Sequence, residues 1–288
     1  MRKSQSAMEY LMTYGWAILA IAIVMVSLYS LGIFNLGNLK PTALPGSCQV
    51  IRTAAQTSLA GQCSNMIPKY VAYFTGSTAY VSVPSNSNLN LNSATFSFWL
   101  YPIIISAADI IERGVGSGAF QQYYIRYTSS TQFQCVLDNG VRFYSITATD
   151  ASLGITANRW NHIACVVNDT GNMAYLYVNG ILKASASPTS SSTSKGSSLL
   201  YIGGYSWDGY SKGYMADAQI YNASLDNVTV NLLYKEGIGG APTNLQHLVG
   251  WWPLNGDAND YSGNNNQGTA TSVIWNANWQ GNYTAPAS

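Results

Sequence analysis

Carboxylate and histidine side chains are the first candidates for chemistry in this chain. Hydrolysis of a glycosidic bond usually needs two carboxylates held about 5–10 Å apart. Asp109 and Glu112 in the run DIIER do not make such a pair, and no GxSxG nucleophile motif is present. His162 and His247 are far apart in sequence, each beside Trp or apolar residues, which favours structural hydrogen bonding. The sequence therefore predicts a protein that is not an enzyme.

Aromatic and acidic residues gather instead in a glycine-rich segment, YIGGYSWDGYSKGYMAD (201–217). Exposed aromatic faces suit the C–H surfaces of sugars or a protein partner, with loop oxygens fixing orientation. An equally good explanation is that these rings complete a core beneath long loops. The candidate ligand-binding residues are Tyr205, Trp207, Asp208, Tyr210 and Tyr214.

Oxygen-bearing side chains are also dense in GDANDYSGN (256–264), where Asp257, Asn259, Asp260 and Asn264 could supply calcium ligands. Side-chain-to-backbone hydrogen bonds that fold the loop explain the same composition without a metal. The second explanation is favoured, and no cofactor is predicted with certainty.

The N-terminus carries an apolar run that predicts a membrane-spanning helix. From Gly15 to Phe34 there is no charged side chain, which is close to the ~20 residues that cross a hydrocarbon core. Arg2 and Lys3 precede this run, so the positive-inside rule predicts a cytoplasmic N-terminus, a single pass and an extracellular body. Glu9 lies near the membrane edge, where a carboxylate is costly without a partner.

Composition indicates an all-β body that does not bind nucleic acid. The chain has 13 Lys+Arg against 12 Asp+Glu, and only 9% of its residues are charged, so no basic face is available. Short runs rich in aromatic and β-branched residues alternate with near period 2 from Tyr70 onwards. In ATFSFWLYP, for example, Phe96, Phe98 and Leu100 fall on one face.

Turn and helix signals separate these strands. Asn139-Gly140 and Asn179-Gly180 each lie between two strand-like runs and predict tight type I′ hairpins. One helix is predicted within residues 224–237. Many antiparallel strands in about 200 residues predict a sandwich or jelly roll.

Cysteine spacing suggests one disulfide outside the cell. Cys48 and Cys63 flank a short segment, and a bond between them would stabilise the fold by roughly 3 kcal/mol. Cys135 and Cys165 lie in apolar strand-like runs, where they could pair across a sheet or stay buried thiols. Buried thiols are slightly favoured, and there is no CxxC spacing for zinc.

The N-terminal residues Lys3-Ser4-Gln5 through Glu9 resemble the class III signal peptide of archaeal type IV pilin-like proteins. The resemblance implies that a prepilin peptidase cuts after Ser4, leaving residues 5–36 as the pilin-like transmembrane helix and 1–4 as leader. In that family the fifth-position carboxylate, here Glu9, meets the α-amino group of a neighbouring subunit. Identical subunits in a surface filament are thus expected partners.

The body resembles the laminin G-like, or concanavalin A-like, jelly-roll family. The resemblance rests on ATFSFWLYP, on WNHI (160–163) leading into MAYLYVNG, on YIGG (201–204), and on GYMADAQIYNASLDNVTVNLLY. LVGWWPLNGDANDYSGNNNQGT (248–269) looks like the opening strand and loop of the family, yet it follows the closing helix. A circular permutation explains this order, so the expected domains are a neck at 37–69 and a jelly roll at 70–288.

The leading hypothesis is a pilin-like structural subunit at the cell surface, presenting a lectin-like sandwich for adhesion to an extracellular glycan or protein. The alternative is a monomeric, membrane-anchored carbohydrate-binding protein, and a glycoside hydrolase is less favoured. Four sequons could be glycosylated outside the cell, at Asn168, Asn222, Asn227 and Asn282. They add little support for a surface protein, because a chain this rich in Asn, Ser and Thr contains several sequons by chance.

Overall fold

The chain divides into two compact units, 1–40 and 41–288, in the computed structural model. The structure describes residues 5–30, 41–64, 66–114, 122–191, 198–205, 209–280 and 283–286. Lys3 and Ser4, on the leader side of the expected cleavage bond, lie outside the described residues, and Gln5 is the first residue of α1.

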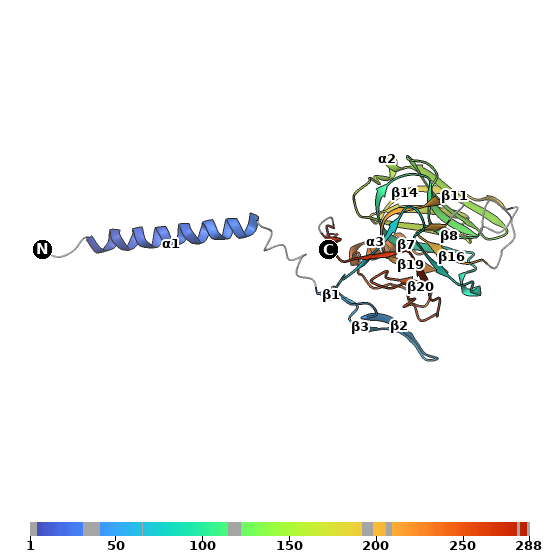
Figure 1. The fold of residues 1–288 in the computed structure, drawn as a ribbon, viewed down its shortest axis with the longest axis horizontal. Coiled ribbons are helices and arrows are strands. Elements are labelled where there is room, and N and C mark those ends of the chain that lie inside the picture. The colour runs from blue at the N-terminus through green and yellow to red at the C-terminus, as the bar shows by residue number, and fades with distance from the viewer. Residues whose placement is uncertain are drawn as a thin grey trace. The chain divides into compact units, whose positions relative to one another are not determined.

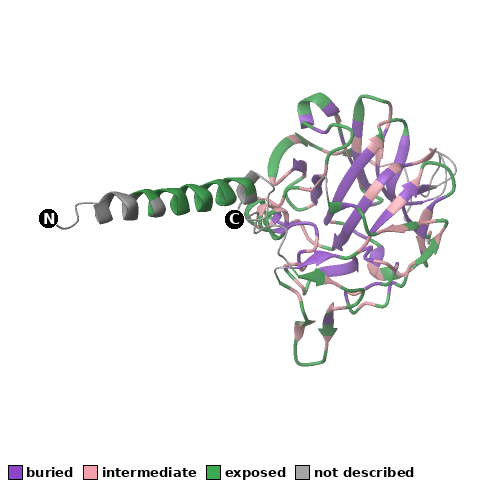
Figure 2. Ribbon diagram, turned by 60° about the vertical axis from the view of Figure 1, so that its left-hand side comes forward, coloured by how far each residue is buried: buried purple, intermediate pink, exposed green. Residues whose placement is uncertain are grey.

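The first unit contains one helix, α1 (Gln5–Ser30). The apolar side chains described on this helix, from Met12 to Val26, are exposed, as the green part of α1 in Figure 2 shows. The backbone of Glu9 is helical, but its side chain is not described. No helix in the described part of the chain is long and apolar enough to cross a membrane, so the expected transmembrane helix is not supported.

The second unit is a sandwich of two antiparallel sheets, as Figure 1 shows. Sheet 1 runs in the order β15 (Thr189–Ser190), β11 (Arg142–Thr149), β10 (Gln132–Asp138), β9 (Tyr123–Tyr127), β8 (Ala108–Arg113), β16 (Leu200–Ile202), β6 (Tyr80–Val83) and β21 (Thr269–Thr271), with the small hairpin β17 (Gly204–Tyr205) and β18 (Gly209–Tyr210) attached to β8.

Sheet 2 packs against sheet 1. It runs in the order β14 (Ile181–Ala186), β13 (Met173–Val178), β12 (Asn161–Asn168), β7 (Ala94–Ile104), β19 (Lys212–Tyr221), β5 (Val71–Thr75) and β22 (Ile274–Asn276), with β20 (Leu248–Trp252) paired to β19.

Alternation along the strands builds the core between the sheets. Phe96, Phe98 and Leu100 of β7 all enter this core, which confirms the predicted face. Trp99 and Tyr101 point to the opposite, outer face of sheet 2 because successive strand residues alternate sides. The purple strands in Figure 2 mark this buried interior.

The C-terminal segment belongs to the same sandwich. Strand β20 pairs with the second half of β19, whereas β5 pairs with its first half. The segment then adds β21 to sheet 1 and β22 to sheet 2. Residues 248–276 therefore complete both sheets, which is the placement expected of a permuted opening strand; the permutation itself stays a prediction.

The predicted helix is present as α3 (Asn227–Glu236), and its N-cap Asp226 accepts a hydrogen bond from the Thr229 backbone N–H at 2.8 Å. Val230 and Leu233 pack on the outer face of sheet 2. The remaining helical elements are a short turn, α2 (Asp150–Leu153), and a 3₁₀ turn, Ser87–Leu89, in the described part of the chain.

The two Asn-Gly hairpins differ. Asn179 and Gly180 both have positive φ, 52° and 74°, as a type I′ turn requires. At the other turn only Gly140 has positive φ. The Asn139 side chain explains the difference, because its oxygen accepts hydrogen bonds from the backbone N–H groups of Val141 and Arg142. The type I′ prediction for residues 139–140 was therefore wrong.

Two small strand pairs precede the sandwich. Strands β1 (Thr42–Ala43) and β4 (Ile67–Pro68) are parallel, and β2 (Cys48–Arg52) and β3 (Thr57–Gly61) form a hairpin. Arg52 ties this hairpin to the sandwich by donating hydrogen bonds to the carbonyl oxygens of Leu245, Leu248 and Ser262. Residues 41–64 of the expected neck therefore pack within the second unit.

Both cysteine pairs are bonded. Cys48–Cys63 closes the β2–β3 hairpin, as predicted. Cys135 of β10 and Cys165 of β12 form a disulfide that joins sheet 1 to sheet 2 through the core. The slight preference for buried thiols was therefore wrong, because these two strands face each other across the sandwich rather than lying in one sheet.

Candidate functional site

Three tyrosines from neighbouring strands form a row on the outer face of sheet 2. Tyr214 of β19 is the cross-strand partner of both Tyr73 on β5 and Tyr101 on β7. Their ring centroids lie 5.0 Å and 5.5 Å from that of Tyr214. Directly opposed residues on one sheet face interact in this way, so antiparallel pairing alone aligns the rings.

Trp160, which immediately precedes β12, extends the row. Its ring centroid lies 5.5 Å from Tyr101 and 6.4 Å from Tyr214. We call Tyr73, Tyr101, Trp160 and Tyr214 the aromatic platform. Tyr101 is buried and the other three rings are half-buried, so the platform presents aromatic surface to solvent.

Polar groups adjoin the platform at one side. Lys212 and Thr75 are cross-strand partners one row away from Tyr214 and Tyr73, and both side chains are half-buried. Gly213 lies between Lys212 and Tyr214, where an added Cβ would collide with the Tyr101 carbonyl group. A glycine here lets β19 approach β7 closely at a register shift.

Such an arrangement can bind a ligand with a flat apolar face and a polar edge. Aromatic side chains supply large, rigid contact area, and a few polar groups fix orientation. Lys212 and Thr75 offer a cationic donor and a hydroxyl at the rim.

A second group of side chains lies on the outer face of sheet 1. A register shift in β8 places both Asp109 and Glu112 on one face, opposite Arg126 and Tyr124 of β9 respectively. The extra residue of a bulge changes the side to which the following residues point. Asp109 and Glu112 are three positions apart, and in a regular strand this spacing would put the two carboxylates on opposite faces.

Tyrosines flank these carboxylates on the other side. Tyr201 of β16 is the partner of Glu112, and Tyr210 of β18 is the partner of Asp109. Tyr80 stacks on Tyr210, with centroids 6.3 Å apart. We call this group the carboxylate–tyrosine array: Tyr80, Asp109, Glu112, Tyr124, Arg126, Tyr201 and Tyr210.

The array is less accessible than the platform. Asp109 and Glu112 are each 1% exposed, and Tyr201 and Tyr124 are also buried. Tyr80, Arg126 and Tyr210 are half-buried. The array therefore places its two carboxylates inside the protein and only part of its rings at the surface.

The predicted ligand-binding residues are divided between these two groups. Tyr210 joins the array on sheet 1, and Tyr214 joins the platform on sheet 2. Tyr205 lies in β17, but its side chain is not described, and Trp207 and Asp208 lie outside the described residues. Residues 201–217 thus cross from one sheet to the other rather than forming one site.

The candidate calcium residues fold their own loop. The buried Asp260 carboxylate accepts hydrogen bonds from the backbone N–H groups of Trp251, Ser262 and Asn266 and from the Ser262 hydroxyl. The side-chain amide of Asn264 donates to the Leu248 and Val249 carbonyl oxygens.

Asp257 accepts hydrogen bonds from Asn259 and from the Tyr261 hydroxyl. No group of three or more His, Cys, Asp or Glu side chains that could hold a metal ion occurs among the described residues. Calcium binding here stays a prediction, and the hydrogen bonds match the loop-folding explanation.

The histidines make structural contacts. His162 is buried, its Nε2 lies 2.9 Å from the Ser97 hydroxyl, and burial lowers its pKa to about 3. His247 is exposed, and its Nδ1 lies 3.1 Å from the side-chain oxygen of Asn222. Neither histidine lies in the platform or the array.

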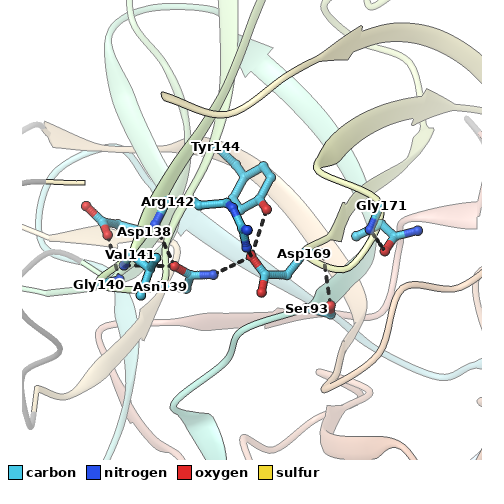
Figure 3. Close-up of polar contacts among 10 residues, drawn as sticks. Ser93, Asp138, Asn139, Gly140, Val141, Arg142, Tyr144, Asp169 and Gly171 are labelled. Atoms are coloured by element: carbon cyan, nitrogen blue, oxygen red, sulfur yellow. Dashed lines mark hydrogen bonds and ion pairs between the residues drawn. The ribbon is translucent and has the colours of Figure 1, made fainter. Parts of the chain in front are cut away.

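Asp169 joins the two sheets at one end of the sandwich, as Figure 3 shows. Its Oδ1 accepts hydrogen bonds from Asn139 at 2.7 Å, Arg142 at 3.0 Å and the Tyr144 hydroxyl at 2.7 Å. Its backbone N–H donates to the Ser93 hydroxyl. Hydrogen bonds from these three groups lower the pKa of the Asp169 carboxyl against the opposing effect of burial.

The candidate glycosylation sites differ in accessibility. Asn222 and Asn227 are exposed. Asn168 is half-buried, and its side-chain oxygen accepts a hydrogen bond from the Gly171 backbone N–H. Asn282 lies outside the described residues.

The fold and the family model agree. The model of the concanavalin A-like lectin/glucanases superfamily matches residues 75–231. The chain belongs to this superfamily. The matched range begins at the end of β5 and ends within α3. The C-terminal strands β20, β21 and β22 therefore lie outside it.

Solved structures resemble this chain at low sequence identity. A Bacteroides ovatus protein described as carbohydrate-binding has a TM-score of 0.52 and 16% identity, over 78% of this chain and 65% of that one. The chain thus spans slightly less than two thirds of that protein's length. A heptameric SAP-like pentraxin from Limulus polyphemus has a TM-score of 0.46 and 14% identity, over 72% and 94%. No curated protein matches the chain.

Proposed function

We propose that the sandwich is a carbohydrate-binding module whose aromatic platform holds the sugar. The observation that carries this proposal is the cross-strand row of Tyr73, Tyr214 and Tyr101, continued by Trp160 at centroid distances of 5.0–6.4 Å. Rings held at fixed spacing by strand pairing lose little conformational entropy when a ligand binds. The carbohydrate-binding description of the Bacteroides ovatus protein is consistent with the proposal.

Accessibility favours the platform over the carboxylate–tyrosine array. Three of the four platform residues are half-buried, against three of the seven array residues, and both carboxylates of the array are 1% exposed. A ligand on the array would have to reach buried groups. A protein partner that buries aromatic side chains is the competing ligand for the platform.

A glycan array probed with the 41–288 fragment tests this function. The fragment is suitable because it contains the whole core and both disulfides. The proposal expects saturable binding to at least one class of glycan, without release of reducing sugar from it. Absence of binding to every glycan would contradict the proposal, and reducing-sugar release would instead favour a hydrolase.

We further propose that residues 1–30 make the chain a pilin-like subunit of the cell surface, processed by a prepilin peptidase and displaying the sandwich outside the cell. The apolar side chains of α1 support this, since large groups such as Met12 and Trp16 are 73% and 71% exposed. A helix that is apolar on every side must be covered by lipid or protein. Equivalent helices of identical subunits are the proposed cover.

Glu9 supplies a means of selecting the neighbouring subunit. A carboxylate within apolar surroundings needs an ionic or hydrogen-bonding partner. The α-amino group exposed after cleavage at Ser4 would be that partner. A monomer held at the membrane by its N-terminal segment is the alternative, and the two are separated by whether filaments form.

A further inference from the structure

A cavity opens beside the buried carboxylate of Asp217 in the second unit. Asp217 lines it together with residues 43–44, 46–48 and 238–240, and with Gln62, Pro68, Trp251, Pro253 and Asn255. Most of the wall is apolar, with Leu44, Ile238 and Pro253 contributing aliphatic surface. Among the described residues that line the cavity, Asp217 is the one with an ionisable side chain that carries charge near neutral pH.

The backbone holds Asp217 in an unusual conformation. Asp217 has φ of 53°, in the left-handed region, at the register shift where β19 exchanges β5 for β20 as its neighbour. Its backbone N–H donates to the Pro253 carbonyl oxygen at 3.0 Å. A non-glycine residue held in this region indicates that the surrounding structure requires it.

Two neutral donors orient the carboxylate. Its Oδ1 accepts from the Trp251 indole N–H at 2.7 Å, and its Oδ2 accepts from the Gln219 amide at 2.8 Å. Asp217 is only 6% exposed. Each carboxylate oxygen has capacity for a further hydrogen bond.

No lysine or arginine in the described part of the chain forms an ion pair with Asp217. The titratable groups that face it are Glu236, Tyr221 and Tyr283, none of which carries positive charge. Burial raises the pKa of Asp217 to about 7 against the opposing hydrogen bonds from Gln219 and Trp251, with a smaller contribution from Glu236. An ionised Asp217 is therefore a buried negative charge without a countercharge, which is costly.

We propose that this cavity binds a primary ammonium group on a short aliphatic stem, with Asp217 as its countercharge. An ammonium group supplies positive charge and three hydrogen-bond donors. The apolar walls suit the methylene stem. The ammonium group can come from the side chain of a lysine in a partner protein or from a small free amine.

The Trp251 indole is a built-in reporter because its N–H donates directly to Asp217. The experiment follows the ¹⁵N–¹H indole resonance of Trp251, assigned with Trp251→Phe, during titration of the 41–288 fragment with n-butylammonium near pH 8. The expected result is a saturable shift with a Kd of about 10 mM or tighter. No shift, or an equal shift with the neutral probe n-butanol, would overturn the proposal.

Two variants test the role of the carboxylate and of the cavity. Asp217→Asn should weaken n-butylammonium binding at least tenfold, since it removes the charge. Leu44→Trp should do the same by filling the cavity while leaving Asp217 unchanged, because Leu44 lines the cavity and is 57% exposed. Leu182→Trp, at a site 49% exposed and outside this cavity, is the matched control and should bind normally.

A pH arm and a second probe complete the test. Near pH 5 the carboxyl of Asp217 is mostly protonated while n-butylammonium remains charged, so affinity should fall at least tenfold. Unchanged affinity would contradict the role of Asp217.

Binding of Nα-acetyl-lysine methylamide as tightly as n-butylammonium would identify a lysine side chain as the fitting source, whereas binding of n-butylammonium alone would identify a free amine. These results do not depend on glycan binding.

Discussion

Tyr214 and Tyr73 face each other across β19 and β5, with ring centroids 5.0 Å apart and planes inclined by 39°. Tyr73 and Tyr214 are 141 positions apart in sequence (214 − 73), so only the sheet brings them together. Their contact fixes two rings at one edge of the aromatic platform. The proposed sugar-binding function rests on this geometry more than on any single residue.

The disulfide between the sheets should contribute strongly to stability. Replacing both Cys135 and Cys165 with Ala opens a closed loop of sequence separation 30, for which the chain-entropy estimate is roughly 3–4 kcal/mol. The free energy of unfolding from urea denaturation measures the loss. The control is Cys48→Ala with Cys63→Ala, whose separation of 15 predicts a smaller loss of about 3 kcal/mol. An unchanged urea midpoint in the Cys135/Cys165 variant would contradict this prediction.

His162 should remain neutral throughout the ordinary pH range. Burial lowers its pKa to about 3, below the unfolded value of 6.5. Between these values the unfolded chain binds a proton that the folded chain does not, so stability falls as pH falls, by at most about 1.4 kcal/mol per pH unit.

An NMR titration of the His162 ring and denaturation at several pH values measure both effects. His162→Gln should flatten the dependence of stability on pH below about 6.5, since it removes this proton. A His162 ring that titrates near its unfolded value would show that the prediction is wrong.

Asp169 should stabilise the end of the sandwich more than its exposed ion-pair partner does. Asp169→Ala leaves Asn139, Arg142 and Tyr144 without their shared acceptor and should cost about 1–3 kcal/mol. Arg142→Ala removes only one pair, made by a side chain that is 39% exposed, so its cost should be clearly smaller. Equal losses in the two variants, measured by denaturation, would refute the shared-acceptor account.

Glu9 should control filament assembly if the chain is a pilin-like subunit. Glu9→Ala removes the carboxylate that would pair with the α-amino group of a neighbour, so filament yield should fall sharply. Electron microscopy of cell-surface fractions measures the yield, with Glu9→Asp as the variant that keeps the charge. If filaments contain the Ala variant and form at wild-type yield, the proposed role of Glu9 is wrong.

Local patterns predicted the elements better than they predicted the site. Alternation in ATFSFWLYP placed Phe96 in the core, and Asn179-Gly180 predicted its turn, because both depend on neighbouring residues. The segment 248–269 was also expected to supply a strand of the sandwich, and β20 within it pairs with β19.

The platform depends on contacts that sequence spacing does not encode. Tyr73, Tyr101 and Trp160 were not predicted, because their meeting with Tyr214 requires the order and register of distant strands. The one local signal was that Tyr101 alternates with Phe98 and Leu100 in β7, which indicates an aromatic ring on the outer face. Asp109 and Glu112 share a face only because of a bulge, which the sequence did not reveal.

The most direct test of the account compares two tyrosines that are four positions apart but lie on opposite sheets. The measurement is the binding isotherm of the 41–288 fragment for its best glycan, with Tyr214→Ala beside Tyr210→Ala. Tyr214→Ala should weaken binding by about tenfold to a hundredfold, as loss of an aromatic anchor does, while Tyr210→Ala should bind as the wild type does. Loss of binding in Tyr210→Ala with wild-type affinity in Tyr214→Ala would contradict the account and move the site to sheet 1.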